Sequence, residues 1–178
     1  GPLWTPGGER GLYKTSDGGE SWKNVLSAGE CTGVTDVVMD PSNPDVLYAA
    51  TWQHHRTVAA YMGGGPESGV HKSVDGGDTW QRLSTGLPMG NMGKIGLAIS
   101  RQDPDVVYAA IELNRREGGV WRSDDGGASW SKGADAVGGG TGPHYYQEIF
   151  TSPHHFDWLY LVGPTVQKST DGGQTFTY

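Results

Sequence analysis

The sequence has a single cysteine, a small share of basic residues and no long apolar stretch. Cys31 stands alone among 178 residues, which excludes an internal disulfide and leaves the redox compartment open. The chain carries 13 Lys and Arg against 20 Asp and Glu, a net charge of -7. Phosphate binding needs clustered Lys and Arg, so this charge argues against a nucleic-acid partner. No apolar run approaches the roughly 18–20 residues of a membrane span, and we expect no membrane insertion.

The periodicity of about 3.6 residues that marks amphipathic helices is nearly absent as well, whereas glycine is abundant. The 30 Gly and 10 Pro residues indicate many tight turns, as in all-β proteins. A chain of 178 residues is long enough for one domain with a sizeable core. We therefore predict an all-β fold in a single domain.

A short pattern, Ser/Thr-x-Asp-Gly-Gly-x-Ser/Thr-Trp/Phe, occurs four times along the chain. The copies read TSDGGESW, SVDGGDTW, SDDGGASW and STDGGQTF. Their central aspartates, at positions 17, 75, 125 and 171, lie 58, 50 and 46 residues apart. Repeats of about 40–50 residues are typical of propellers and solenoids.

Each repeat has the same order of apolar segments, and each segment has the length of a β-strand. First strands are expected at 33–39, 93–99 and 145–151, and second strands at 46–51, 106–111 and 158–163. Third strands lead into the Asp motif at 69–73, 119–123 and 165–169, and fourth strands leave it at 79–83, 129–133 and 175–178. Residues 11–25 supply only a third and a fourth strand.

This order predicts a β-propeller of four-stranded antiparallel blades, with about three and a half blades in this chain. The predicted single propeller segment spans 1–178, with a half blade at 11–26 and full blades at 33–84, 93–133 and 145–178. A propeller closes to avoid open sheet edges, and three and a half blades do not close alone.

The four motifs resemble Asp boxes, also called BNR repeats, of sialidases, sortilin-type receptors and xyloglucan-degrading glycoside hydrolases. The segments GERGLYKTSDGG (8–19) and MDPSNPDVLYAATWQHHR (39–56) are similar to large secreted bacterial proteins with a sortilin-like (VPS10-like) Asp-box propeller, often labelled glycosyl hydrolases. This resemblance implies a propeller fold and a secreted or periplasmic location. Those proteins are much longer, so the chain looks like a segment of one.

The repeated motif has the residues of a tight turn. Two glycines permit positive backbone angles, and the Asp carboxylate accepts hydrogen bonds from turn amides, with a further bond from the preceding Ser or Thr. A calcium loop is the rival interpretation, but such loops alternate several oxygen ligands and end in a bidentate Glu. The closing aromatic residue is expected in the blade core, which assigns a structural role to Asp17 and Trp22, Asp75 and Trp80, Asp125 and Trp130, and Asp171 and Phe176.

Loops of unequal length are expected on the face opposite the Asp motifs, where propellers usually bind ligands. Aromatic side chains beside arginines and carboxylates suit the stacking of sugars or the binding of peptides. The predicted ligand-binding residues come from the connections 52–68, 112–117 and 134–146: Trp52, His54, Arg56, Tyr61, Glu112, Arg115, Tyr145 and Tyr146. The alternative is that Arg56, Arg115 and Arg116 are solvated or form salt bridges between blades.

A catalytic pair of carboxylates is the enzymatic alternative. Aligning the first strands by their turns gives Asp36, Gly96 and Glu148 equivalent places, so Asp36 and Glu148 are expected beside the central channel. Glycosidases hold two carboxylates roughly 5–9.5 Å apart. On the other hand, a carboxylate on an inner strand often binds a neighbouring backbone or a channel water. The Arg-Ile-Pro segment of sialidases is absent, and so are the common hydrolase and phosphate-loop motifs.

No metal or other cofactor is expected. His54 and His55 lie in a loop on one face, whereas His154 and His155 replace residues of a turn on the opposite face. Adjacent histidines in a strand also point in opposite directions.

The sequence therefore predicts an extracellular propeller that binds a peptide, protein or glycan partner, and a xyloglucanase-like or sialidase-like glycoside hydrolase is the alternative. Two copies of three and a half blades would sum to seven, a common propeller size. The expected partner for the open edges is thus a second copy or the remaining blades of a longer chain.

Overall fold

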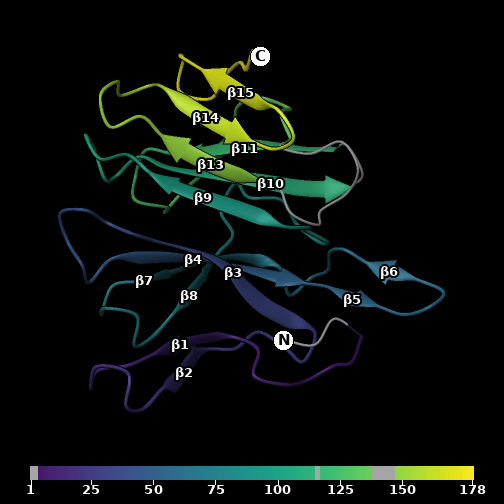
Figure 1. Ribbon diagram of the computed structural model, residues 1–178. Coiled ribbons are helices and arrows are strands. Elements are labelled where there is room, and N and C mark those ends of the chain that lie inside the picture. The colour runs from purple at the N-terminus through teal and green to yellow at the C-terminus, as the bar shows by residue number, and fades with distance from the viewer. Residues whose placement is uncertain (1–3, 115–116, 138–146) are drawn as a thin grey trace.

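The computed structural model describes residues 4–114, 117–137 and 147–178, and within them the chain forms β-strands and no helix. The strands belong to four antiparallel sheets that lie side by side in chain order (Figure 1) and to one separate hairpin. This arrangement confirms the predicted all-β fold of about three and a half blades.

The N-terminal sheet, here called the half-blade, pairs β1 (Leu12–Lys14) with β2 (Lys23–Leu26). Blade I has the order β3 (Thr32–Met39), β4 (Leu47–Gln53), β7 (Gly69–Ser73) and β8 (Gln81–Leu83). Between β4 and β7 a hairpin is formed by β5 (His55–Arg56) and β6 (Tyr61–Met62).

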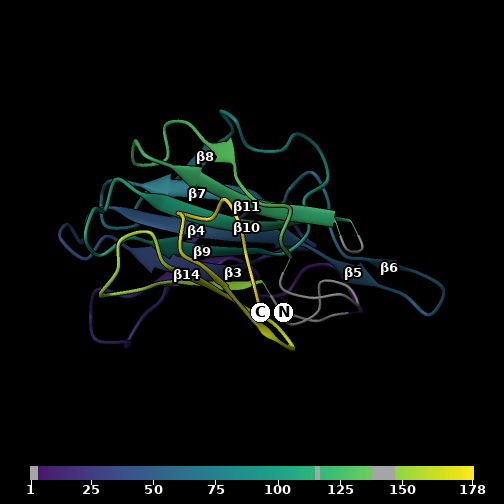
Figure 2. The same ribbon diagram turned by 90° about the horizontal axis from the view of Figure 1, so that it is seen from above.

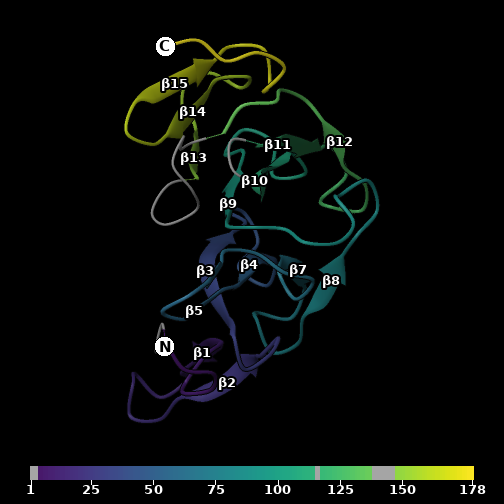
Figure 3. The ribbon, with the colours of Figure 1, turned by 90° about the vertical axis from the view of Figure 1, so that its right-hand side faces the viewer.

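Blade II has the order β9 (Ile95–Ile99), β10 (Val107–Asn114), β11 (Glu117–Ser123) and β12 (Ser131–Lys132). Blade III contains β13 (Glu148–Thr151), β14 (Leu159–Val162) and β15 (Val166–Ser169). A fourth strand was predicted at 175–178, but this segment contributes only an isolated bridge between Lys168 and Thr177. Figure 3 shows the first strands β3, β9 and β13 along one edge of the stack, where β9 contacts both of the others.

Two clusters of buried side chains bind the blades to one another. The first lies between blades I and II and contains Tyr48, Val70, Leu97 and Trp121. The second lies between blades II and III and contains Tyr108, Val120, Ile149 and Leu161. The hydrophobic core is therefore made at the junctions between blades, where sheet faces pack together.

The Asp motif forms the same turn in every blade. Asp125 accepts hydrogen bonds from Ser123 Oγ (2.7 Å) and from the backbone N–H and Oγ of Ser129 (2.8 and 2.5 Å). Gly126 and Gly127 have φ values of 64° and 86°, a region that favours glycine. These bonds hold the pKa of the Asp125 carboxyl at about 2, below its ordinary value.

The aromatic residue that closes the motif does not always reach a core. Trp130 is buried, its indole N–H donates to the carbonyl of Gly127, and its backbone N–H donates to the carbonyl of Thr85, just after blade I. Trp22, in contrast, is 60% exposed, so its predicted packing into a blade core is wrong. The physical reason is that the described residues include no blade before the half-blade that would cover the Trp22 ring.

Candidate functional site

The connection 52–68 contains the hairpin β5–β6, which projects from the end of blade I (Figure 2). The guanidinium of Arg56 lies 5.2 Å from the ring centroid of Trp4, and Tyr61 pairs with Arg56 across the hairpin. His54 is half-buried, and burial together with the charge of Arg10 lowers its pKa. These polar side chains thus support the hairpin and its contact with the N-terminal segment.

Trp52 does not offer a free face for a ligand, which corrects its predicted role in direct binding. It is 7% exposed, its indole N–H donates to the carbonyl of Gly63 over 2.9 Å, and its ring stacks on His54 with centroids 4.2 Å apart. With one face covered and its polar atom paired, Trp52 fixes the base of the hairpin.

A chain of hydrogen bonds links the connection 52–68 to blade II. Gly65 N–H donates to the carbonyl of Met92, and Gly93 N–H donates to that of Glu112. Glu112 N–H in turn donates to the carbonyl of Lys94. The linker 92–94 is therefore held between Gly65 of the connection 52–68 and strand β10.

Glu112 lies at the end of β10 and is 6% exposed. None of the residues that the structure describes gives its carboxylate a hydrogen bond or an ion pair. Burial raises the pKa of this carboxyl to about 7. Glu112 therefore changes its charge near neutral pH, as proton donors of enzymes do.

The strand registers give Asp36, Gly96 and Glu148 equivalent positions on the three first strands. Asp36 pairs with Ala50, Gly96 with Ala110 and Glu148 with Val162, each three residues before the end of its strand. A Cβ at position 96 would overlap the carbonyl oxygen of Gln147, so glycine permits β13 to approach β9. The inner strands are thus close enough to bring Asp36 and Glu148 onto one surface.

Asp36 and Glu148 line the same groove along β3, β9 and β13, which has a volume of about 450 Å³. We call this feature the inner groove. Its other walls include the exposed side chains of Met39 and Phe150, with Arg101 near the turns. A groove with carboxylates and an exposed aromatic ring has the chemistry of a carbohydrate site, where rings stack on sugars and carboxylates bind hydroxyl groups.

The two carboxylates of the inner groove have different partners. Asp36 accepts a hydrogen bond of 2.8 Å from Leu97 N–H, whereas Glu148 accepts one of 2.9 Å from Lys94 Nζ. Burial raises the pKa of Asp36, and the Glu148 charge raises it further, while the Leu97 bond and Lys94 lower it. Two carboxyl groups in unlike surroundings are the arrangement that acid–base chemistry uses.

Sequence reasoning did not single out Lys94 or Phe150. Lys94 is buried, and a lysine is rarely buried unless it is paired. A buried lysine therefore points to a nearby carboxylate. Of the predicted ligand-binding residues, Arg115, Tyr145 and Tyr146 lie outside the described residues. Within the described residues no helix is long and apolar enough to cross a bilayer, and no group of three His, Cys, Asp or Glu side chains is placed to hold a metal.

The chain is similar in sequence and in structure to several known proteins. No family model matches the chain. The chain is 27% identical over 176 residues to a xyloglucanase of Hypocrea jecorina, a match that covers 88% of this chain and 19% of that protein. It is 28% identical over 133 residues to the xyloglucanase Xgh74A of Acetivibrio thermocellus, covering 68% of this chain and 15% of the relative. The chain thus spans less than one fifth of the length of these curated relatives.

Among solved structures, the GH74 xyloglucanase from Xanthomonas campestris superimposes with a TM-score of 0.68 at 19% identity. The match covers 93% of this chain and 24% of that enzyme. The chain folds as β-propeller blades. The curated relatives are xyloglucanases, whereas the similar solved structures also include YCF48 bound to the D1 peptide, with a TM-score of 0.55 at 13% identity, so the solved structures show the fold alone.

Proposed function

We propose that this chain is part of a glycoside hydrolase that acts on a xyloglucan-type polysaccharide, with the inner groove as a binding site for the glycan chain. The observation that carries the proposal is the sequence similarity to xyloglucanases over 88% of the chain. This similarity favours the enzymatic alternative over binding without catalysis, which was the main expectation from the sequence.

The inner groove supplies groups for both binding and proton transfer. Phe150 is 54% exposed and offers an aromatic face on which the apolar side of a sugar ring stacks. Asp36, with its raised pKa, is the proposed proton donor to the glycosidic oxygen. Glu148, held by Lys94, is the proposed carboxylate that accepts a proton from water.

A polysaccharide substrate also favours a location outside the cytoplasm, secreted or periplasmic, as the sequence resemblance implied. The finer relationship to sortilin-like Asp-box proteins rests on the four Asp motifs and their shared turn geometry. The location outside the cytoplasm and the relationship to sortilin-like proteins are both part of this proposal.

The test separates binding from hydrolysis. Affinity electrophoresis in gels containing xyloglucan measures binding, and the release of reducing ends measures hydrolysis. F150A is expected to weaken binding about tenfold, the effect of a lost stacking contact of about 1.4 kcal/mol. F156A is the matched control, because Phe156 is exposed in the β13–β14 turn and does not line the groove.

D36N and E148Q keep the size of each side chain and remove its charge. Both are expected to bind xyloglucan as the unaltered chain does and to lose the release of reducing ends, at least about a hundredfold. Unchanged rates in both variants would exclude this carboxylate pair. Equal retardation of F150A, F156A and the unaltered chain would exclude the groove as the glycan site.

A further inference from the structure

Arg101 differs from the other arginines of this chain in having no partner for its side chain. Among the residues that the structure describes, no hydrogen bond, ion pair or aromatic ring engages its guanidinium. The other described arginines bind carbonyl oxygens, carboxylates or a ring: Arg10 binds Gly7, Arg56 lies over Trp4, Arg82 binds Ser68, and Arg122 binds Asp124 and Asp157. The guanidinium of Arg101 is therefore available to a ligand.

The turn that carries Arg101 does not neutralise its charge. Arg122 pairs with Asp124, two residues further along the chain, at 2.7 Å. Asp103 stands two residues after Arg101, yet its carboxylate accepts a hydrogen bond from the backbone N–H of Asp105. Arg101 instead lines the inner groove. Its positive charge thus belongs to the groove.

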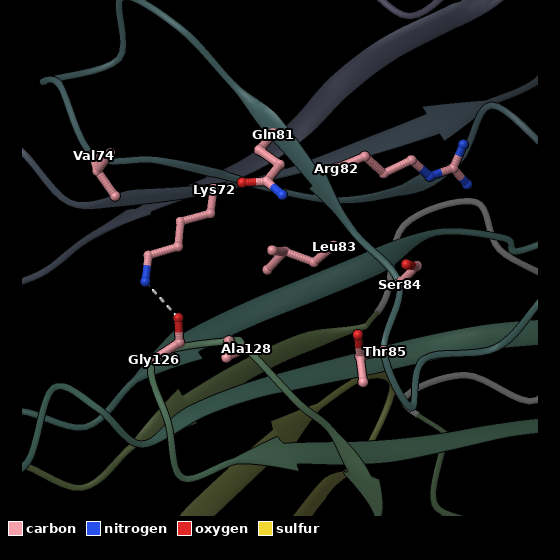
Figure 4. A pocket seen from close by; sticks show the side chains of 10 residues that line it. Lys72, Val74, Gln81, Arg82, Leu83, Ser84, Thr85, Gly126 and Ala128 are labelled. Atoms are coloured by element: carbon pink, nitrogen blue, oxygen red, sulfur yellow. Dashed lines mark hydrogen bonds between the residues drawn. The ribbon is translucent and has the colours of Figure 1, made fainter.

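A second cleft, of about 410 Å³, lies between blade I and the Asp motif of blade II, and its cations are already bound. Lys72 Nζ donates to the Gly126 carbonyl over 2.6 Å (Figure 4). Arg82 donates to the carbonyl of Ser68 over 2.7 Å. Both side chains therefore hold the fold together, whereas the cation of the inner groove does not.

The backbone of Arg101 is held in place on both sides. Ser100, which precedes it, is fully buried, and its hydroxyl accepts hydrogen bonds from the backbone N–H groups of Gln102 and Asp103 at 3.3 and 3.2 Å. Gln102, which follows it, donates over 3.1 Å to the carbonyl of Ser152 in blade III. The turn is thus fixed before a ligand binds, which lowers the cost of ordering it.

Arg101 also has neighbours on both sides within the described chain. It follows strand β9, which contacts β3 of blade I and β13 of blade III (Figure 3). Pro41 of blade I and Thr151 of blade III line the same groove. The surroundings of Arg101 are therefore formed by the blades before and after its own, and not by an end of the chain.

The inner groove has unlike charges at its two ends. Asp36 and Glu148 lie three residues before the ends of their strands, roughly 10 Å along the groove from the turns. Lys94 pairs with one of these carboxylates, Glu148. Arg101 lies beyond the end of β9, at the turns. A carboxylate on a ligand is repelled at the first end and attracted at the second, so the groove distinguishes the two ends of an acidic ligand.

We propose that Arg101 binds the carboxylate of an acidic sugar unit in the inner groove and so sets the direction in which the glycan chain lies. The planar guanidinium presents two parallel N–H donors to a carboxylate. The acidic unit binds at the turns, and the neutral units extend toward Asp36 and Glu148. This inference rests on the proposed function, because it takes the groove as the glycan site, and it adds β-glucans with a uronic acid unit to the substrate class.

The experiment compares three tetrasaccharides of the same β-1,4 linkage: cellotetraose, and the two tetramers with a single glucuronic acid at the reducing or the non-reducing end. Isothermal titration calorimetry measures their affinity for the whole chain. One acidic tetramer is expected to bind at least about tenfold more tightly than the other two sugars, the effect of one charge-assisted pair. R101Q is expected to abolish this preference and to leave the affinity for cellotetraose unchanged. R101K keeps the charge without the planar donors and is expected to retain only part of the preference.

K23Q is the matched control, because Lys23 is exposed, carries the same charge and does not line the groove. It is expected to leave all three affinities unchanged, and circular dichroism establishes that the variants are folded. Equal affinities of the unaltered chain for the three sugars would overturn the inference and leave the proposed function in place. No binding of any tetrasaccharide would overturn both. Binding of tetraglutamate as tight as that of the preferred sugar, and lost in R101Q, would overturn the sugar assignment in favour of an acidic peptide.

Discussion

The ammonium group of Lys94 donates a hydrogen bond of 2.9 Å to the carboxylate of Glu148 and so joins blade II to blade III at the inner groove. Both residues precede or begin a first strand, β9 and β13 respectively. The positive charge of Lys94 also lowers the pKa of Asp36, whereas the negative charge of Glu148 raises it. Lys94 therefore contacts one carboxylate of the groove and lowers the pKa of the other.

K94M is expected to raise the pKa of Asp36, because it removes a positive charge and leaves Glu148 without its partner. Titration of the Asp36 carboxyl by NMR measures this pKa directly. K132M serves as the control, since Lys132 pairs with the exposed Asp135, and an equal titration curve for K94M and the unaltered chain would contradict the coupling.

G96A tests the close approach of β9 and β13. An added Cβ would overlap the Gln147 carbonyl oxygen, so either the strands separate or the chain is strained. We expect a loss of about 1–3 kcal/mol in the free energy of unfolding, as for overpacked cores. G33A is the matched control, because no atom lies within 4 Å of a Cβ at Gly33. Urea denaturation compares the two variants, and equal midpoints would refute the steric role.

Much of this fold could be predicted from the sequence, because its signals are local. The Asp-Gly-Gly turns and the alternation of apolar strands fix the blades, and Asp36, Gly96 and Glu148 could be aligned by counting from the turns. Contacts between blades could not be predicted in this way. The exposure of Trp22 depends on which blade covers the ring, and the same motif buries Trp130.

The site was predicted less completely for the same reason. The hairpin β5–β6 has no counterpart among the described residues of the other blades, and the burial of Trp52 follows from its contacts with Gly63 and His54. Lys94 and Glu148 are 54 residues apart in the sequence, so no local pattern predicts their ion pair. Long-range pairing of this kind follows from how the blades pack.

Y48F and Y108F distinguish two equivalent tyrosines. Tyr48 Oη donates a hydrogen bond of 2.8 Å to the Gly126 carbonyl, whereas Tyr108 Oη is buried with no hydrogen bond to any residue that the structure describes. Y48F is therefore expected to cost about 0.5–1.5 kcal/mol in the free energy of unfolding. Y108F is expected to be neutral or stabilising, because it removes an unpaired polar atom. Denaturation curves that fall equally for both would contradict this difference.

E112Q is expected to change how stability depends on pH. The Glu112 carboxyl has an ordinary pKa of 4.5 in the unfolded chain and a pKa of about 7 in the folded protein. Between these values the folded state binds more protons than the unfolded state, so the free energy of unfolding falls as pH rises through this window. Below pH 4.5 the stabilising contribution of the protonated Glu112 carboxyl is fully present, and above a pH of about 7 this contribution is lost.

Because glutamine stays neutral, the free energy of unfolding of E112Q does not fall in this way as the pH rises. The variant is expected to match the unaltered chain near pH 4 and to exceed its free energy of unfolding by roughly 1–3 kcal/mol near pH 8. E30Q is the matched control, since Glu30 is exposed and the same substitution there relieves no burial. Urea denaturation at several pH values measures the difference. Parallel curves for E112Q and the unaltered chain would mean that the buried carboxyl is already compensated and does not titrate near neutral pH.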